Sequence, residues 1–270
     1  MKIYVALNVE QRLDVQIISN TNIEVSGDLF DRMQETFKGP KLRDWCQEVG
    51  LLQVETDFAD RRRRGGPISV QIARTFISNY FSGFNVDAQK FDFTATNPII
   101  SPTGLIDLNW ELLTSSNQAM WTDQNLKRAG KEFAKLVVAQ RNAFSGKKAK
   151  PDMPEKALNI AILAAWAYTA GMLHANDVRL SRHYSLANTT GKDPLNAAEL
   201  AKASHKTDPD NYRGLGYRTD AKERGRFVEL FYLQAEKGEG INAAIIKLAI
   251  AKYHAKIAQL EVIEVAKQGE

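Results

Sequence analysis

Hydrophobic and polar residues alternate near the start of the chain. Every second position is apolar in residues 3–7 and again in residues 13–17, and a third such segment, NIEV, follows the Asn-Thr-Asn turn at 20–22. A period of two, with turn residues between the segments, is typical of β-strands. The pattern therefore predicts a small antiparallel sheet at the N-terminal end. The segment LLQVETDF, residues 51–58, predicts a further strand.

Apolar positions recur every three or four residues over most of the remaining chain, which is the repeat of an α-helix. Residues 157–173 carry no charge. A membrane-spanning helix needs about 20 mostly apolar residues, so this shorter run predicts a helix buried on all sides. The stretch 84–121 is irregular. The predicted helices are residues 28–37, 42–49, 68–81, 122–144, 155–174, 195–206 and 221–236.

These elements predict a mainly α fold with a small N-terminal β element, arranged as two lobes and an arm. The predicted units are an N-terminal lobe, 1–120, a C-terminal helical lobe, 121–237, and a C-terminal arm helix within 238–270. The last helix has about seven turns. One face of it either links protomers or packs on the core of its own chain, and both alternatives stay open. That face carries Ile246, Ile250, Tyr253, Ile257 and Leu260.

The composition narrows the class of protein. The chain has 270 residues, of which 44% are hydrophobic and 25% charged, as in ordinary globular proteins. The first twenty residues lack the pattern of a signal peptide. The one cysteine, Cys46, allows no internal disulfide, which favours a reducing compartment. Four histidines and one cysteine are a poor supply of ligands for a transition metal. We therefore expect no metal, no cofactor and no membrane span.

Enzyme motifs are absent from the sequence. The chain contains no P-loop, HExxH, CxxC or GxSxG motif. One acidic set, Asp208, Asp210 and Asp220 beside Lys222, has the residue types of a magnesium-dependent nuclease. The competing interpretation is a solvated turn that caps a helix beginning at Asp220. The sequence predicts no catalytic residue.

Charge is distributed unevenly along the chain. The net charge is +4, yet residues 1–60 hold 6 Lys and Arg against 11 Asp and Glu, whereas residues 122–192 hold 12 against 5. Segregated charge creates a field that one kind of partner can feel, and phosphate is the commonest such partner. A solvated surface with scattered lysines is the alternative.

Four consecutive arginines, Arg61–Arg64, precede Gly-Gly-Pro. These turn residues place the arginines on a loop at the entrance to a helix. Such a loop can close over a polyanion without a fixed base code. The alternative is a charged loop that contacts only water.

Further basic clusters are interleaved with aromatic residues. Positive charge that follows a phosphate backbone, with rings on which bases stack, is typical of single-strand binding. No RNP motif, zinc finger or basic zipper occurs, so sequence-specific DNA recognition is not indicated. The predicted nucleic-acid contacts are Arg61, Arg62, Arg63, Arg64, Lys127, Arg128, Lys131, Lys147, Lys148, Lys150, Arg179, Arg182, Tyr184, Tyr212, Arg213, Tyr217 and Arg218.

The order of features in residues 51–110 resembles the nucleocapsid proteins of segmented negative-strand RNA viruses, the orthobunyavirus type in particular. The shared features are a strand, a basic Pro/Gly loop, the amphipathic helix ISVQIARTFISNYF and the stretch NPIISPTGLIDLNW. The resemblance implies two lobes, a basic cleft between them and arms that hook onto neighbours. It also implies RNA contact by Arg61–Arg64. This chain is longer on its C-terminal side, and residues 122–270 have no residue-by-residue match.

These observations predict a sequence-tolerant single-stranded RNA-binding protein, not an enzyme, that oligomerises and encapsidates a genome as a ribonucleoprotein. The expected location of a viral protein of this kind is the host cytoplasm and the virion. One alternative is an enzyme that processes nucleic acid, such as a metal-dependent nuclease of microbial defence. Another is a basic module that binds an acidic protein. The sequence does not distinguish RNA from single-stranded DNA.

Overall fold

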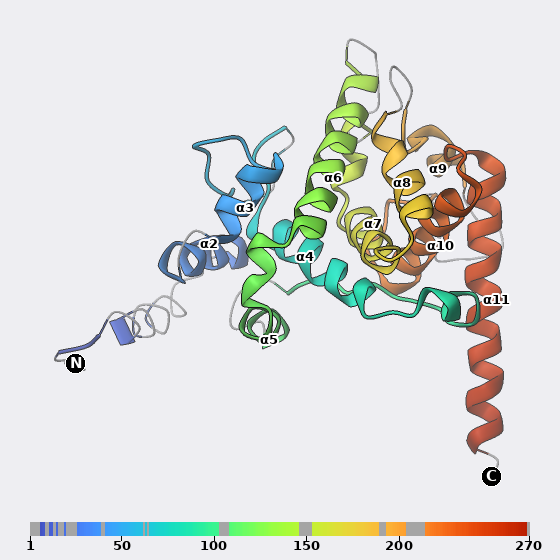
Figure 1. Cartoon of the computed structure of the whole chain (residues 1–270), viewed down its shortest axis with the longest axis horizontal. Coiled ribbons are helices and arrows are strands. Elements are labelled where there is room, and N and C mark those ends of the chain that lie inside the picture. The colour runs from blue at the N-terminus through green and yellow to red at the C-terminus, as the bar shows by residue number, and fades with distance from the viewer. Residues whose placement is uncertain are drawn as a thin grey trace.

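A computed structural model describes residues 6–8, 11–12, 15, 19, 26–38, 41–61, 63, 65–102, 108–145, 153–188, 193–203 and 214–268. Within these ranges the fold is mainly helical and contains no strand, so the mainly α prediction is confirmed. Packed helices form a body with the long α11 along one side (Figure 1). The α-helices are α2 (Gly27–Lys38), α3 (Lys41–Val49), α4 (Val70–Phe84), α5 (Leu108–Ser116), α6 (Gln124–Ala143), α7 (Ile160–Met172), α8 (Asp177–Tyr184), α9 (Ala197–Lys202), α10 (Ala221–Lys237) and α11 (Ala243–Gln268).

Four short 3₁₀ helices connect them. They are η1 (Ala88–Phe93), η2 (Gln118–Thr122), η3 (Met153–Leu158) and η4 (Ser185–Asn188). The predicted N-terminal sheet falls mostly on residues outside the described ranges. Val15 and Ser19, which are described, have helical backbone, so the strand predicted over 13–17 does not fit Val15.

Residues 51–58 form turns, and the strand predicted there is wrong. Gly50 adopts a left-handed conformation with φ 82° and ends α3, and the next two N–H groups both bond to the carbonyl of Cys46. Glu55 also has a positive φ of 66°, which a strand residue does not adopt. The apolar side chains that suggested a strand instead pin the turn to the core, because Leu52 and Phe58 are buried.

α7 is buried on all sides, as predicted. Every residue from 161 to 172 is buried, and α4 and α10 both pack against this helix. The helix begins at Ile160 rather than 155, because the side chain of Asn159 caps it by accepting from the N–H of Ala161 at 2.9 Å. The uncharged run therefore forms the centre of the core.

Two glycines allow α4 and α7 to cross with their backbones in contact. A Cβ placed on Gly83 would lie 1.9 Å from the carbonyl oxygen of Tyr168, and one placed on Gly171 would lie 1.9 Å from the carbonyl oxygen of Tyr80. Neither position has room for a methyl group. The crossing fixes the distance between the two central helices.

α6 lies over the same core. Asp123 caps this helix by accepting from two backbone N–H groups of its first turn, at 2.8 and 3.2 Å; Thr122, with which the predicted helix began, ends η2 instead. The ring of Phe133 lies 5.3 Å from that of Phe76 and 5.0 Å from that of Trp166, between centroids. Because this side of α6 is buried, its opposite side faces solvent.

α11 is packed on the body over its first half and free over its second. Ile246, Ile250 and Tyr253 are buried, and α11 contacts α10 and α9. The buried Lys256 places its Nζ 2.6 Å from the carboxylate of Glu229 in α10. Beyond this pair the helix extends away from the body (Figure 1), and every side chain from 261 to 267 is exposed.

The hydrophobic core continues across residue 120. Buried residues from both predicted lobes belong to one cluster, and α4 of the first predicted lobe packs on α7 of the second. The described residues on the two sides of residue 120 thus share one core, and the division into two lobes stays a prediction. None of the helices in the described ranges has the length and apolar character needed to cross a membrane.

Candidate nucleic-acid interface

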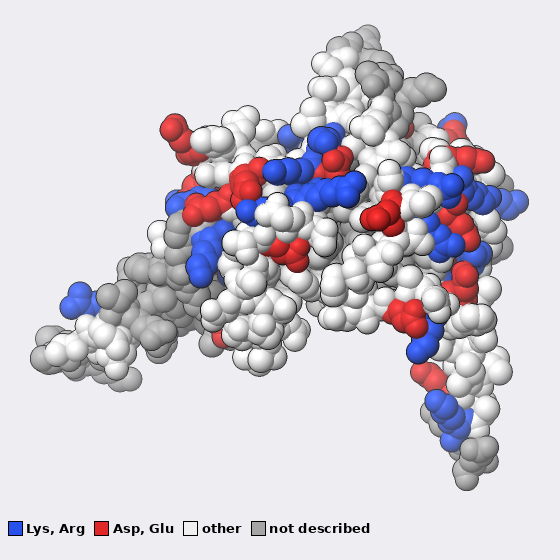
Figure 2. Space-filling model, in the orientation of Figure 1, with Lys and Arg blue, Asp and Glu red and all other residues white. Residues whose placement is uncertain are grey.

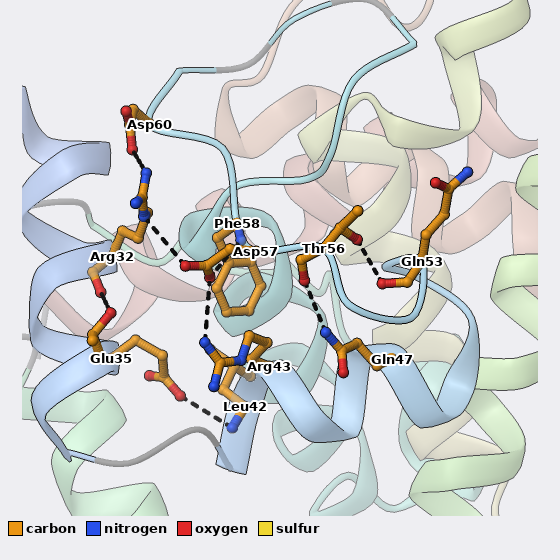
Figure 3. A network of polar contacts seen from close by, with 11 residues as sticks. Arg32, Glu35, Leu42, Arg43, Gln47, Gln53, Thr56, Asp57, Phe58 and Asp60 are labelled. Atoms are coloured by element: carbon orange, nitrogen blue, oxygen red, sulfur yellow. Dashed lines mark hydrogen bonds and ion pairs between the residues drawn. The ribbon is translucent and has the colours of Figure 1, made fainter.

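Ion pairs hold the segment that leads into the arginine loop (Figure 3). Arg32 of α2 pairs with Asp57, at 3.5 Å, and with Asp60. Arg43 of α3 reaches the same Asp57 at 3.9 Å. Two arginines from neighbouring helices therefore pair with carboxylates of the segment that leads into the loop.

The arginine loop is closed at its base and exposed at its tip. The N–H of Ala59 donates to the carbonyl of Ile68 at 3.0 Å, and Ile68 is buried. Gly65 has a φ of 68°, a left-handed conformation that favours glycine. Arg61 and Arg63 are exposed. The loop is therefore fixed at its base and exposes the charged side chains of Arg61 and Arg63 to solvent.

A groove of about 790 Å³ runs along the solvent face of α6, within the size range of ligand sites. The C-terminal end of α3, with Gly50, forms part of its lining, as does Ala187 of η4. Lysines and arginines gather over α6 on this face of the molecule (Figure 2). The charged residues of the lining are Lys127, Arg128, Lys131, Lys135, Glu48 and Glu132.

Four cations and two carboxylates give this lining a net charge of +2. Lys127 lies 2.8 Å from Glu48, and Lys135 lies 2.7 Å from Glu132. Lys131 is exposed, and no ion pair joins it to another described residue. Ion pairs at a surface are weak, so a phosphate oxygen can replace the carboxylate as partner of either lysine.

Arg128 is oriented by an aromatic ring. Its guanidinium carbon lies 5.4 Å from the ring centroid of Tyr184. The ring of Tyr184 also contacts the ring of Trp166, with the two ring centroids 5.7 Å apart, and Tyr184 is only 6% exposed. This corrects the prediction that Tyr184 stacks on bases, because the ring has no free face. Its role is to hold Arg128 at the groove.

Arg179 and Arg182 tie α8 to α10. Arg179 donates to the hydroxyl of Tyr232 at 2.8 Å and lies over its ring. Arg182 donates to the carbonyl of Glu236 at 2.7 Å. Neither residue belongs to the groove lining. Both arginines thus contribute to the packing of α8 on α10, and their predicted contact with phosphate stays a prediction.

Tyr217 and Arg218 precede α10 and lie outside the groove lining. The ammonium of Lys156 lies 4.1 Å from the ring centroid of Tyr217, and Arg218 pairs with Asp220. The side chain of Asp220 accepts from the N–H of Glu223 at 2.9 Å, which confirms the capping interpretation of this aspartate. Within the described ranges, no three His, Cys, Asp or Glu side chains gather as a metal site would require.

Other predicted contacts lie outside the described residues, and their roles stay predictions. The same holds for Asp208 and Asp210 of the acidic set. The predicted nucleic-acid contacts in this group are Arg62, Arg64, Lys147, Lys148, Lys150, Tyr212 and Arg213.

The structure divides the predicted oligomerisation face. Ile246, Ile250 and Tyr253 are buried within the protomer, so they contribute to its own core and do not meet a neighbour. Ile257 and Leu260 are half-buried. Packing on the core of its own chain therefore describes the first half of α11, and the linking of protomers by the second half stays a prediction. The exposed apolar residues of the free half are Val262, at 69%, Ile263, at 41%, and Val265, at 70%.

α3 connects the arginine loop to the groove, which the sequence did not reveal. Gln47 donates its amide to the carbonyl of Thr56 at 2.8 Å, below the loop, and residues 47–50 line the groove. The charge pattern drew attention only to basic segments, whereas this wall carries Glu48 and the apolar Val49. The pairing of α3 with α6 across 80 positions of sequence is a tertiary feature.

Comparisons of this chain with protein-family models, with curated proteins and with solved structures find no match. The features of the chain that bear on its function are the arginine loop, the groove along α6 and the free half of α11.

Proposed function

We propose that the chain is a single-stranded RNA-binding protein that oligomerises along the strand and coats it without regard to sequence. The observation that carries this proposal is the groove along α6, whose four cations lie beside the same helix, α3, that anchors the arginine loop. Phosphates of the strand contact Lys127, Lys131 and Lys135 in the groove. The arginine loop folds over the strand from the α3 side.

Several features favour the binding of a single strand through contacts that do not depend on its base sequence. The cations are flexible lysines and arginines, which bind phosphates as charges and carry no sequence information. The groove also contains apolar surface from Val138, which is 53% exposed and against which a base can pack. Among the described residues the geometry does not favour the nuclease alternative, because no metal-type cluster of side chains forms there and Asp220 serves as a helix cap.

The resemblance to orthobunyavirus-type nucleocapsid proteins supports a more specific version of this proposal. In that version the chain encapsidates a viral RNA genome in the host cytoplasm and is carried in the virion. The free half of α11 is the arm: its exposed valines and isoleucine dock on the next protomer, and head-to-tail contacts of this kind produce rings or open helices.

Fluorescence anisotropy with a labelled single-stranded RNA, at two salt concentrations and with duplex as competitor, tests the binding proposal. We expect affinity that falls steeply with salt and is insensitive to duplex. Replacing Arg61–Arg64 by alanine should lower the slope of log affinity against log salt by up to about 3, since each phosphate contact on a single strand contributes about 0.7. The melting temperature should not change.

Charge reversal in the groove supplies the second variant. Lys131→Glu with Lys135→Glu should weaken RNA binding more than tenfold, because two cations become two anions beside the phosphates. The matched control reverses Lys90 and Lys202, whose side chains are 79% and 71% exposed and lie outside the groove. Equal losses of RNA affinity in the two double variants would show that only the net charge of the chain matters, and would refute RNA binding in the groove.

Truncation tests the arm. A chain that ends at Gln259 keeps the packed half of α11 and its Lys256–Glu229 pair, but loses Val262 and Val265. We expect it to melt like the full chain, to bind RNA as a monomer and to form no rings or filaments by light scattering and electron microscopy. A truncated chain that still forms rings or filaments would show that the free half of α11 is not the arm that links protomers. Truncation after Gly238 is unsuitable because it removes core residues.

A further inference from the structure

A second cavity, of about 280 Å³, lies between α2, the start of α3, α4, α5 and η2. Trp110 and Trp121 line it and meet edge to face, with centroids 6.3 Å apart and planes at 72°. Trp110 is 7% exposed, whereas Trp121 is half-buried. The volume is just below the usual range of small-molecule sites. This cavity, named the tryptophan pocket here, therefore suits one planar ring system rather than an extended ligand.

A buried cation lies in the wall of the tryptophan pocket. Arg74 is 3% exposed, and its guanidinium carbon lies 5.6 Å from the ring centroid of Trp110. Its one ion pair is with Asp31, at 3.2 Å, and its Nε–H has no hydrogen-bond acceptor among the described residues. A buried ion pair is weak evidence of stabilisation. Arginine planes combined with aromatic rings are, however, the surfaces on which unstacked RNA bases lie.

The polar rim indicates which ring system fits. Glu35 and Glu111 belong to the lining, and carboxylates repel phosphates but accept hydrogen bonds from the amino groups of bases. Glu35 accepts from the N–H of Leu42 at 3.0 Å, and a carboxylate can accept several hydrogen bonds at once. Cytosine, adenine and guanine each carry an exocyclic amino group, whereas uracil carries none. The remaining polar lining residues are Gln34, Lys41, Thr114, Ser115 and Gln118.

The tryptophan pocket and the groove lie at the two ends of α3. Lys41, the first residue of α3, lines the pocket, and Gly50, just after its last, lines the groove. A helix of this length spans about 13 Å. On the other wall, Trp121 of the pocket is followed three residues later by Gln124 of the groove. At about 3.4 Å for each stacked nucleotide, one strand reaches both sites within about four nucleotides.

We propose that the tryptophan pocket holds one unstacked base of the bound strand and prefers bases that carry an exocyclic amino group over uracil. This inference rests on the proposed RNA binding for its biological context, but the pocket itself can be tested without a strand. The base lies against Trp121 and the Arg74–Trp110 stack. Glu35 and Glu111 accept hydrogen bonds from its amino group.

The test is a titration of the full chain with each of the four ribonucleoside 5′-monophosphates, followed by tryptophan fluorescence. Trp45 and Trp166 are 2% and 1% exposed, so quenching reports on the other two of the four tryptophans. We expect saturable quenching by AMP, CMP and GMP, and binding of UMP that is at least about fivefold weaker. No saturable quenching by any of the four, or equal binding of UMP, would overturn the proposal.

Two variants tie the effect to the pocket. Glu111→Gln replaces an acceptor by a side chain that also donates, so it should narrow the difference between CMP and UMP at least about threefold while leaving the circular dichroism spectrum unchanged. Trp121→Ala should abolish the saturable signal. An unchanged ratio in the first variant would count against the pocket even if the second failed to fold.

A parallel measurement of strand binding separates this inference from the proposed function. Mononucleotide binding without strand binding would keep the tryptophan pocket and remove the coating function. Strand binding with no mononucleotide quenching, and with an affinity for cytosine-rich RNA that Glu111→Gln does not alter, would keep the coating function and remove the pocket.

Discussion

The crossing of α4 and α7 makes Gly171→Ala a sharp test of the fold. In almost any helix this substitution stabilises, by about 1 kcal/mol, because alanine has the higher helix propensity. Here the new Cβ would lie 1.9 Å from the carbonyl oxygen of Tyr80, and 2.8 Å from the N of Phe84. These are backbone atoms, which cannot rotate away, so the two helices must separate.

The size of the effect follows from the contacts. A methyl carbon needs more than 3 Å from a carbonyl oxygen, so the helices must move apart by more than 1 Å over the most buried part of the core. Overpacking a core costs about 1–3 kcal/mol, and a clash with backbone belongs at the upper end. With the propensity gain subtracted, we expect a net loss of about 2 kcal/mol, or a decrease in melting temperature of about 4–8 °C.

Urea denaturation of the two proteins provides the assay, with the m-value checked for constancy. Gly240→Ala is the matched control, since a Cβ at Gly240 meets nothing within 4 Å. Gly83→Ala should resemble Gly171→Ala, and the double variant should lose less than the sum, because one separation accommodates both methyl groups. An unchanged or raised stability of Gly171→Ala would refute the close crossing.

Two further predictions concern buried charges. Burial raises the pKa of Glu223 to about 7, although the hydrogen bond that its carboxylate accepts from the N–H of Gly216 opposes this shift. Between about pH 4.5 and 7 the folded chain therefore holds a proton on Glu223 that the unfolded chain has lost. The free energy of unfolding should consequently fall by about 3 kcal/mol as the pH rises through this window. Glu223→Gln should remove that decrease in urea denaturation at pH 5 and 7.5, and an identical pH dependence would contradict the assignment. Lys256→Met leaves the side chain of Glu229, which is 1% exposed, without its cation and should lower the free energy of unfolding by about 3–5 kcal/mol. Adding Glu229→Gln should restore part of this stability, because the buried charge is then removed. A double variant as unstable as Lys256→Met alone would argue against the pair.

The helices were predictable from the sequence because their signals are local. The periodicity of α4, α6 and α10 and the uncharged run of α7 depend only on neighbouring residues. The strand predicted over 51–58 failed because nothing in the sequence marks Glu55 as left-handed. The irregular stretch 84–121 contains η1, α5 and η2; the two 3₁₀ helices are too short to show a period, and α5 buries only Trp110 and so has no apolar face to reveal it.

The candidate site was predictable only in part, since charge is visible in a sequence but partners are not. Lys127 and Lys131 were singled out on their charge as nucleic-acid contacts, and both line the groove, but their contact with nucleic acid stays a prediction. The pairing of Lys127 with Glu48 joins helices far apart in the sequence. Burial of Tyr184 under Arg128 is likewise decided by tertiary packing. The tryptophan pocket is lined by residues of five elements, so no local motif in the sequence indicates it.

The half-buried, half-free construction of α11 has a consequence for the order of its end. Forming the first turn is the unfavourable step of helix formation, whereas each later residue adds a hydrogen bond to a helix that already exists. The buried turns around Ile246 and Tyr253 complete this step inside the core. The turns beyond Lys256 then grow on a finished template, so they are helical before any partner arrives. A neighbour that binds them loses little conformational entropy to ordering, which favours association through a helix that has few contacts of its own.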